Sequence, residues 1–378
     1  MKREFFGYGS ISNLQEIIDS YKAKNVFLVT GKKSYKLSGA EKTIKPFLKD
    51  LKYTHYNQFS ANPDIKDVKN GIELYKKVNP DLVIAIGGGS VLDIAKAISV
   101  LSDQDNEPVY FIKGEKKLEK KGKPIVAIPA TAGTGSEATR FSTIYIDKKK
   151  YSLSHEKFTL PSVSIIDPFL TESMPQYLTA VTGLDALCQA IESIWSVNST
   201  NESERFAEQA VKLAFNNIKK AVKNPDKESR LNMAKAANLS GKAINISKTT
   251  ACHSISYPIT SFFDIAHGHA VVLTMPEIIE FNYNVSISDC NDKRGVEFVK
   301  KQMDKIFKLL DAIDEKDAKN KFYDLMKEID VKTKLSDFDI DKKGIEIIIK
   351  EGFTPDRMNN NPRKITKQQL NVILERIL

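Results

Sequence analysis

Cysteine, histidine and tryptophan are scarce in this chain, whose 378 residues include three, five and one of them, respectively. The cysteines Cys188, Cys252 and Cys290 are odd in number, form no CxxC pair and have no zinc-finger spacing, so neither a disulfide framework nor a cysteine-based metal site is indicated. No apolar run reaches the roughly 18 residues that a membrane-spanning helix needs. The first residues, MKREFFGYGS, are too polar and charged for the apolar core of a signal peptide. We therefore expect a cytoplasmic protein with no membrane partner.

The basic residues give little sign of a nucleic-acid partner. Although the net charge is +9, the lysines are interleaved with 48 acidic residues. The densest basic run, KGEKKLEKKGK at 113–123, contains no aromatic residue on which a base could stack, so we interpret it as a solvated surface loop. With 41% hydrophobic and 28% charged residues the composition is that of a globular protein, and the length favours two domains.

Short apolar runs alternate with helical stretches in the first half of the chain. The runs contain almost no polar residue, which is typical of parallel strands covered by helices on both faces; they lie at 25–31, 82–89, 124–131 and 163–167. Residues 142–155 add a predicted hairpin. Beyond about residue 180, apolar residues recur at three- and four-residue spacing, which predicts amphipathic helices at 203–222, 229–244 and 295–313. The sequence thus predicts an α/β domain over 1–180 and an all-α domain over 181–378.

Two glycine-rich loops follow predicted strands of the first domain. In VIAIGGGSVLDIAKA (83–97) the glycines let backbone N–H groups approach a phosphate, and the N-terminus of the next helix adds a partial positive charge. In IPATAGTGSEAT (128–139) small and hydroxyl side chains can bond ribose and phosphate oxygens. A turn that only connects two elements is the alternative for the first loop, but two such loops on one sheet predict a Rossmann-like dinucleotide site. Its candidate residues are Gly87, Gly88, Gly89, Ser90, Asp93, Thr131, Thr134 and Ser136.

The second predicted domain contains a set of candidate metal ligands. Asp185 and Gln189 are four residues apart in TGLDALCQAIESIW, so they share one face of a predicted helix. His253 and His267 are two of the five histidines and are separated by fourteen positions. A carboxylate with two imidazoles suits Fe(II) or Zn(II).

Five motifs occur in a fixed order over nearly the whole chain: GGGSVLDIAKA, PATAGTGSEAT, TGLDAL, the His253 and His267 pair, and NNPR at 360–363. Together they resemble the iron-containing (group III) alcohol dehydrogenases. The resemblance implies the two-domain fold shared with dehydroquinate synthase, with metal and substrate in the cleft between the domains. It assigns the metal, Fe²⁺ with Zn²⁺ as the alternative, to Asp185, His253, His267 and the position of Gln189, where the family has a further histidine. Glutamine offers only a neutral carbonyl oxygen, so either it is a poorer ligand or the metal is lost and the amide only hydrogen-bonds.

Three positions near these ligands depart from the family's pattern or lie outside it. Lys248 stands where many members have glycine, and a lysine so near a metal is costly to bury unless an anionic substrate offsets its charge. Tyr257 stands where members often have a histidine that faces the substrate. His269 is not a usual ligand, and it has either a structural role or a contact with the substrate or a proton relay. We take Lys248, Tyr257 and His269 as candidate catalytic residues.

Three arginines extend the positive charge around the expected substrate site. Arg140 follows the second loop, and Arg357 and Arg363 accompany NNPR, the family's cleft-lining motif. Each alone fits a solvated charge, but with Lys248 they become candidate contacts for an anionic group. This combination is similar to the phosphonoacetaldehyde reductases within the family and implies reduction of phosphonoacetaldehyde to 2-hydroxyethylphosphonate. The alternatives are a dehydrogenase or reductase for another small aldehyde or alcohol, phosphorylated or uncharged, and a metal-free nucleotide-binding protein.

The dinucleotide preference is read from the end of the first apolar run. Members that prefer NAD usually have an aspartate there, which binds the adenosine ribose and repels a 2′-phosphate. This chain has Gly31, followed by Lys32 and Lys33, which favours NADP(H) over NAD(H). Family members are commonly dimers or larger, so the resemblance also implies a homo-oligomer.

Overall fold

The structure of the protein, a computed structural model, describes residues 3–378 and divides into two compact units. The first ends at Met174 and the second begins at Pro175. The predicted domain boundary at 180/181 falls inside helix α7 (Gln176–Trp195), and the whole of this helix belongs to the second unit. The helix begins directly after Pro175. Proline has no backbone N–H to donate, so it is tolerated at the start of a helix but interrupts the interior of one.

The first unit is built on a six-stranded sheet in which neighbouring strands are parallel. The strands, in their order across the sheet, are β1 (Arg3–Phe6), β8 (Val163–Ile166), β5 (Ile125–Pro129), β4 (Leu82–Gly87), β2 (Asn25–Thr30) and β3 (Lys52–Tyr56). The four predicted apolar runs are the four interior strands, and the prediction misses the two edge strands β1 and β3.

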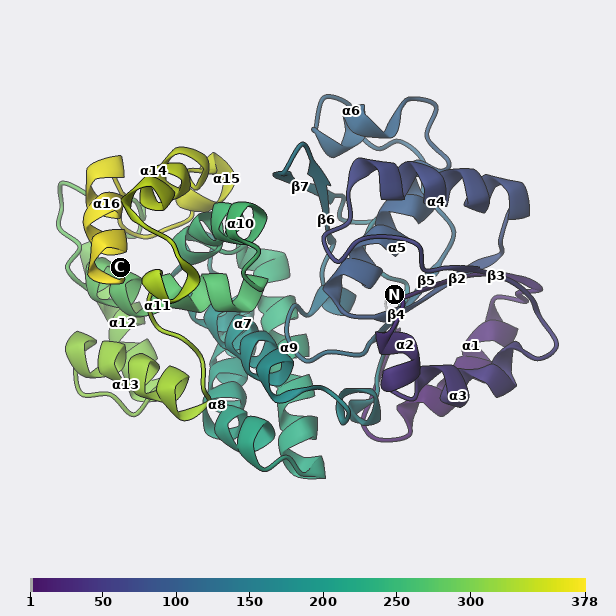
Figure 1. The fold of residues 1–378 in the computed structure, drawn as a ribbon, viewed down its shortest axis with the longest axis horizontal. Coiled ribbons are helices and arrows are strands. Elements are labelled where there is room, and N and C mark those ends of the chain that lie inside the picture. The colour runs from purple at the N-terminus through teal and green to yellow at the C-terminus, as the bar shows by residue number, and fades with distance from the viewer. Residues whose placement is uncertain (1–2) are drawn as a thin grey trace. The chain divides into compact units, whose positions relative to one another are not determined.

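Helices cover both faces of this sheet, as Figure 1 shows. Phe27 and Val83 point into the core beneath α4 (Ile65–Val78) and α5 (Gly89–Leu101). Their neighbours Val26 and Ile84 point the other way, into the core formed with α1 (Leu14–Ser20), α2 (Ser34–Leu37) and α3 (Ala40–Ile44). Because successive residues of a strand face opposite sides, burial of both faces requires the unbroken apolar runs seen in the sequence.

Smaller elements complete the first unit. Strands β6 (Phe141–Ile146) and β7 (Lys149–Ser154) pair antiparallel, which confirms the predicted hairpin. The others are α6 (Pro108–Ile112) and the 3₁₀ turns η1 (Ser10–Asn13), η2 (Lys45–Leu48), η3 (Ser136–Ala138) and η4 (Pro168–Thr171).

The second unit is helical, as predicted. Three of its helices, α8 (Asn201–Lys223), α9 (Lys227–Ser247) and α12 (Val296–Leu309), correspond to the three amphipathic stretches of the sequence. The remaining helices are α7, α10 (Ala251–Phe263), α11 (His267–Tyr283), α13 (Glu315–Glu328), α14 (Lys342–Glu351), α15 (Pro355–Met358) and α16 (Lys367–Arg376), with the turn η5 (Ser336–Phe338). Over residues 3–378, no helix has both the length and the apolar character needed to cross a membrane.

Candidate metal and dinucleotide sites

Helices α7, α10 and α11 bring together Asp185, His253 and His267, three of the four ligands predicted from the sequence. One potential ligand atom of each lies within 4.8 Å of the others. Asp185 and His253 are 2% and 4% exposed, and Asp185 Oδ1 faces His253 Nε2 at 3.4 Å. In the described part of the chain neither of these two atoms has a hydrogen-bond partner. A buried carboxylate oxygen and a buried ring nitrogen left open toward one point fit a bound divalent cation.

A carboxylate that the sequence analysis missed orients His253. Glu192 is fully buried on α7 and accepts hydrogen bonds from His253 Nδ1, from the backbone N–H of Cys252 at 2.8 Å and from the hydroxyl of Thr250 at 2.8 Å. Because Glu192 holds the Nδ1 proton, His253 Nε2 is left as the ligand atom. The signal in the sequence is the spacing: Glu192 follows Asp185 by seven residues, two helical turns on the same face.

The electrostatics of this cluster also suit a cation. Burial alone would lower the pKa of His253, but the carboxylates of Glu192 and Asp185 raise that pKa to about 9. Two buried carboxylates therefore require positive charge beside them, which a protonated His253 supplies when no metal is bound. A divalent cation held between Asp185 and a neutral His253 would supply the same charge, so these residues fit the metal.

Gly268 lets the third ligand approach. A Cβ atom on Gly268 would lie 1.9 Å from the carbonyl oxygen of Val181 and 2.9 Å from Cβ of Asp185, so any larger residue would push α11 away from α7. His267 therefore reaches Asp185 because its neighbour has no side chain. Ser256 Oγ donates to the carbonyl of His253 at 2.8 Å and lies 3.4 Å from His267 Nδ1. Since the serine proton is used, Nδ1 is the donor here, and Nε2 of His267 is left for the metal.

Gln189, the fourth predicted ligand, lies on the same face of α7 and is 3% exposed. Its amide Nε2 donates to Asp185 Oδ2 at 3.0 Å, and its Oε1 lies 3.3 Å from the hydroxyl of Ser240 on α9. The structure therefore places Gln189 beside Asp185, with its Nε2 donating to that ligand and its Oε1 facing the hydroxyl of Ser240.

Lys248 occupies an unusual backbone conformation just before α10. Its φ of 60° and ψ of 172° lie in a region that is essentially restricted to glycine. The flanking residues fix this conformation: Ser196 Oγ donates to the carbonyl of Ser247 at 2.8 Å, and Asn360 Nδ2 donates to the carbonyl of Thr249 at 3.0 Å. The side chain is half-buried, and among residues 3–378 its ammonium group has no ion pair or hydrogen bond. This half-buried, unpaired cation lies five residues before His253 in the sequence.

The other two candidate catalytic residues lie in different settings. Tyr257 is half-buried, and its ring centroid is 6.3 Å from that of His267. His269 is 1% exposed, its Nε2 donates to the carbonyl of Lys332 at 2.8 Å, and its Nδ1 accepts from the hydroxyl of Tyr177 at 3.0 Å. Burial lowers the pKa of His269, which keeps the ring neutral. Both nitrogens of His269 are thus engaged, by α7 and by the segment after α13, whereas Tyr257 lies beside a ligand.

Each of the three candidate arginines has its own setting. In the first unit, Arg140 NH1 lies 3.9 Å from a carboxylate oxygen of Glu156. In the second, Arg363 donates to Asp289 Oδ2 and to the carbonyl of Phe281, both at 2.7 Å, and Arg357 lies on α15. The contacts of Arg363 fasten the NNPR segment to the preceding helices. Among the candidate cations for the substrate, Lys248 is the one closest in sequence to a predicted ligand.

In the first unit the two predicted dinucleotide loops lie against each other. The backbone N–H of Ala130 donates to the carbonyl of Gly87 at 2.9 Å, and a Cβ atom on Gly89 would lie 2.9 Å from Cγ2 of Thr134. Gly88 similarly faces Thr131 at 3.4 Å. At Gly89 a side chain would crowd Thr134, so this glycine lets the second loop approach the N-terminus of α5, where a phosphate would bind. Ser90 Oγ donates to the carbonyl of Ala61.

Asp93 and Ser136 hold the second loop in place. Ser136 Oγ donates to Asp93 Oδ1 at 2.6 Å, and the backbone N–H of Thr143 donates to Asp93 Oδ2 at 2.9 Å. Lys96, which the sequence analysis missed, is fully buried and donates to Ser136 Oγ and O at 2.7 Å and to the carbonyl of Phe141 at 2.8 Å. These contacts shape the loop from beneath, while Thr131 and Thr134 are its partly exposed residues.

Gly31 lies directly after β2. A Cβ atom there would lie 2.2 Å from Ser34 Oγ, so the turn into α2 is closed tightly around the glycine. Lys32 and Lys33 are exposed, and no ion pair involves them anywhere in residues 3–378. Two uncompensated ammonium groups thus follow the strand at the place where the sequence analysis expects the ribose.

Comparisons with known proteins agree with this arrangement. Residues 2–168 match the model of the family described as iron-containing alcohol dehydrogenase, and residues 179–378 match the C-terminal model of the same family. The chain belongs to the iron-containing alcohol dehydrogenases. It is therefore an oxidoreductase that acts on alcohols or aldehydes with a nicotinamide dinucleotide, and its fold is the one that the sequence resemblance implies.

Several members of the family resemble this chain to a similar degree. The phosphonoacetaldehyde reductase of Streptomyces viridochromogenes is 33% identical over 308 residues, which cover 79% of this chain and 76% of the relative. Long-chain-alcohol dehydrogenase 1 of Geobacillus thermodenitrificans is also 33% identical, over 279 residues that cover 73% of this chain and 70% of the relative. Equal identity to proteins with such different substrates leaves the substrate to be argued from the site.

A solved structure in the family matches the whole chain. The sulfoacetaldehyde reductase of Bifidobacterium kashiwanohense, solved with NAD⁺, is 30% identical with a TM-score of 0.88, and the match covers 100% of this chain and 96% of that one. Its stated substrate, like that of the Streptomyces relative, is a small aldehyde with an acidic group.

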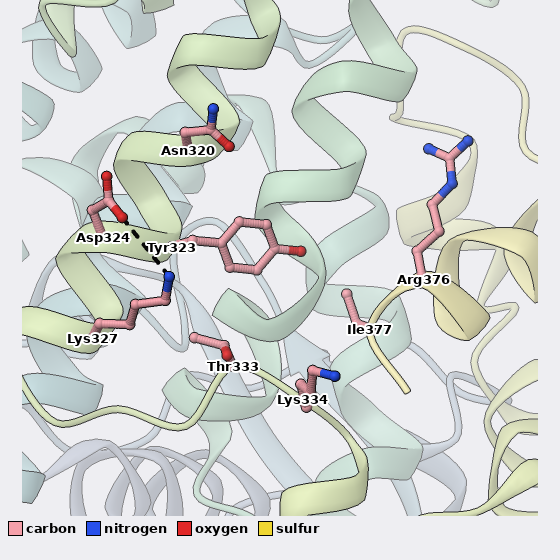
Figure 2. Close-up of a pocket in the computed structure, with 8 residues that line it drawn as sticks. All are labelled: Asn320, Tyr323, Asp324, Lys327, Thr333, Lys334, Arg376 and Ile377. Atoms are coloured by element: carbon pink, nitrogen blue, oxygen red, sulfur yellow. Dashed lines mark ion pairs between the residues drawn. The ribbon is translucent and has the colours of Figure 1, made fainter.

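This chain itself also has a separate cavity, lined by residues near its end and shown in Figure 2. Its charged groups are largely compensated within the protein: Lys327 lies 4.0 Å from Asp324, and Arg376 lies 3.4 Å from Glu277. The residues that line it are Asn320, Tyr323, Asp324, Lys327, Thr333, Lys334, Arg376 and Ile377. None of them belongs to the predicted site, so the cluster around Asp185 remains the candidate centre of the second unit.

Proposed function

We propose that this protein reduces a small anionic aldehyde with NADPH, and that the substrate is phosphonoacetaldehyde, which becomes 2-hydroxyethylphosphonate. The observation that carries the proposal is Lys248, a half-buried cation without a partner, held in a glycine-type conformation five residues before the predicted ligand His253. A strained conformation costs about 1–3 kcal/mol and is retained where the surroundings enforce it, commonly at functional sites. An acidic group on the substrate would supply the missing partner.

In this proposal each residue of the site has a distinct task. Asp185, His253, His267 and the amide of Gln189 would hold Fe²⁺ or Zn²⁺, which when bound supplies a Lewis acid that polarises the aldehyde carbonyl. Glu192 keeps the proton on His253 Nδ1 and so maintains the ligand atom. Lys248 binds the acidic group of the substrate and fixes its orientation for hydride transfer from the nicotinamide to the carbonyl carbon. Tyr257 packs beside His267 and from there would face the substrate.

The variant Lys248→Gly separates the effect of Lys248 on the stability of the protein from its effect on catalysis. With phosphonoacetaldehyde, kcat/KM is expected to fall roughly 10- to 100-fold, the equivalent of one charge-assisted hydrogen bond, while an uncharged aldehyde of similar length is little affected. The free energy of unfolding is expected to rise by about 1 kcal/mol, because relief of the backbone strain outweighs the added entropy of glycine in the unfolded chain. NADPH oxidation and thermal unfolding measure the two effects.

Lys22→Gly is the matched control, since Lys22 is also a lysine with positive φ, at 50°, but lies exposed in the first unit. It should leave the activity with both aldehydes unchanged. Equal losses with charged and uncharged aldehydes in Lys248→Gly would show that Lys248 does not recognise an acidic group. Faster turnover of sulfoacetaldehyde than of phosphonoacetaldehyde would keep the anionic class but change the substrate within it.

The preference for NADPH rests on Lys32 and Lys33. We expect the double variant Lys32→Ala, Lys33→Ala to lower the ratio of kcat/KM for NADPH to that for NADH by roughly 10- to 100-fold, because contacts between ammonium groups and a 2′-phosphate are charge-assisted. Lys36→Ala, which removes another exposed lysine of α2, should leave the ratio unchanged. A wild-type enzyme that uses NADH as well as NADPH would contradict the preference.

A metal-free nucleotide-binding protein is the alternative that Gln189 raises. Metal analysis of the purified protein, together with NADPH oxidation in the presence of phosphonoacetaldehyde and of uncharged aldehydes, separates the two readings. Bound metal and turnover support the reductase, whereas dinucleotide binding without metal and without turnover of any aldehyde would overturn it.

A further inference from the structure

Ser240 has more acceptors around it than it has protons to donate. Its hydroxyl, fully buried on α9, lies 2.9 Å from the carbonyl oxygen of Ala237 and 3.3 Å from Oε1 of Gln189. A serine hydroxyl carries one proton, and the shorter contact to the helix carbonyl takes it. Gln189 Oε1 is then left facing a lone pair of Ser240, an unfavourable contact in a buried site.

A half-turn of the Gln189 amide would remove this conflict. It exchanges the two ends, so that Nε2 donates to the lone pair of Ser240 and Oε1 takes the position beside Asp185 Oδ2. Two oxygens side by side repel each other unless a cation lies against both of them. The arrangement with Nε2 directed at Asp185 therefore suits the site without metal, and the reversed arrangement suits the site with metal.

We propose that Ser240 is a positioning residue of the metal site: it accepts a hydrogen bond from Gln189 Nε2 in the metal-bound protein and thereby directs Gln189 Oε1 at the metal. The inference deepens the proposed function and rests on its metal site. Only the oxygen of a glutamine amide can bind a metal, so the amide must be held with that end toward the metal. A hydrogen bond from Gln189 Nε2 to Ser240 would hold it in that orientation. The hydroxyl of Ser240 thus acts on the metal through Gln189 and does not contact it.

A double-mutant cycle on the full chain tests this inference through metal affinity rather than activity. The dissociation constant for Zn²⁺ is measured by competition with a chromophoric chelator in the wild type, Ser240→Ala, Gln189→Ala and the double variant. Ser240→Ala is expected to raise this constant roughly 3- to 10-fold in the wild type, since one hydrogen bond that orients a ligand is lost. In the Gln189→Ala background it should have no further effect.

The control is Ser164→Ala, which removes a fully buried hydroxyl that donates to the carbonyl of Glu137 in the first unit, at 2.8 Å. It should not change the affinity for Zn²⁺, and thermal unfolding of each metal-free variant reports any general loss of stability. An equal loss of affinity in both backgrounds, or no loss in the wild type, overturns the role of Ser240 while leaving the metal site intact. A wild-type protein that binds no Zn²⁺ overturns the proposed metal site itself, and the role of Ser240 with it.

Discussion

Asp185→Asn is expected to lower kcat/KM for aldehyde reduction by roughly 10²- to 10⁴-fold, the several kcal/mol that a Lewis acid contributes to stabilising the transition state. Asp185 supplies the only carboxylate of the predicted ligand set, and its Oδ1 is buried with no hydrogen-bond partner among residues 3–378. Asparagine keeps the volume of the side chain, so the helix packing should survive, but it removes the negative charge that attracts the cation.

The metal content of the purified variant and its NADPH-oxidation rate are the two measurements. Dinucleotide binding should be unchanged, because every predicted dinucleotide residue lies in the first unit. Asp304→Asn, which alters an exposed carboxylate on α12, should keep both metal and activity. Full metal content in Asp185→Asn would mean that the metal lies elsewhere, and full activity without metal would remove the Lewis acid from the proposal.

The strands show where apolar patterning succeeds and where it fails. Each of the four predicted strands is interior, so a helix layer on each face requires apolar side chains at almost every position. The two missed strands are the edges, β1 with the sequence REFF and β3 with KYTHY. Edge strands tolerate charged and polar side chains that face solvent, so their sequences carry no continuous apolar run.

In the metal site too, some residues could be predicted from the sequence and others could not. Asp185 and Gln189 share a helix face, and the family resemblance adds His253 and His267, so these four could be predicted from the sequence. Glu192 could not be assigned, because its task comes from a contact with a residue sixty-one positions later. Its place on the face of Asp185 suggests burial but does not identify a partner.

Buried polar residues outside the motifs were harder still. Lys96 in DIAKA has the sequence of an ordinary solvent-facing lysine, and only the fold shows it fully buried against the second glycine-rich loop. The backbone conformation of Lys248 also emerges only from the structure, although the glycine that many family members have there agrees with its φ of 60°.

Lys96→Met is expected to lower the free energy of unfolding of the first unit by about 3–5 kcal/mol, the usual cost of removing one partner from a buried charged network. Methionine fills a similar volume but donates no hydrogen bond. The carbonyls of Ser136 and Phe141 would lose a donor, and Asp93 would lose the ammonium group that lies 3.6 Å from its Oδ1. Urea unfolding followed by circular dichroism measures the loss.

The same variant should also weaken binding of the dinucleotide, because the second loop keeps its shape through Ser136. The matched control is Lys69→Met: Lys69 pairs with Glu107 at 2.8 Å, but both side chains are largely exposed, so solvent screens the pair. It should alter neither unfolding nor the dissociation constant for NADPH. If Lys96→Met destabilises the protein but binds NADPH normally, Lys96 supports the fold without shaping the loop. If it behaves like Lys69→Met in both measurements, the buried network has no net stabilising role, because the loop then holds its conformation through its backbone alone.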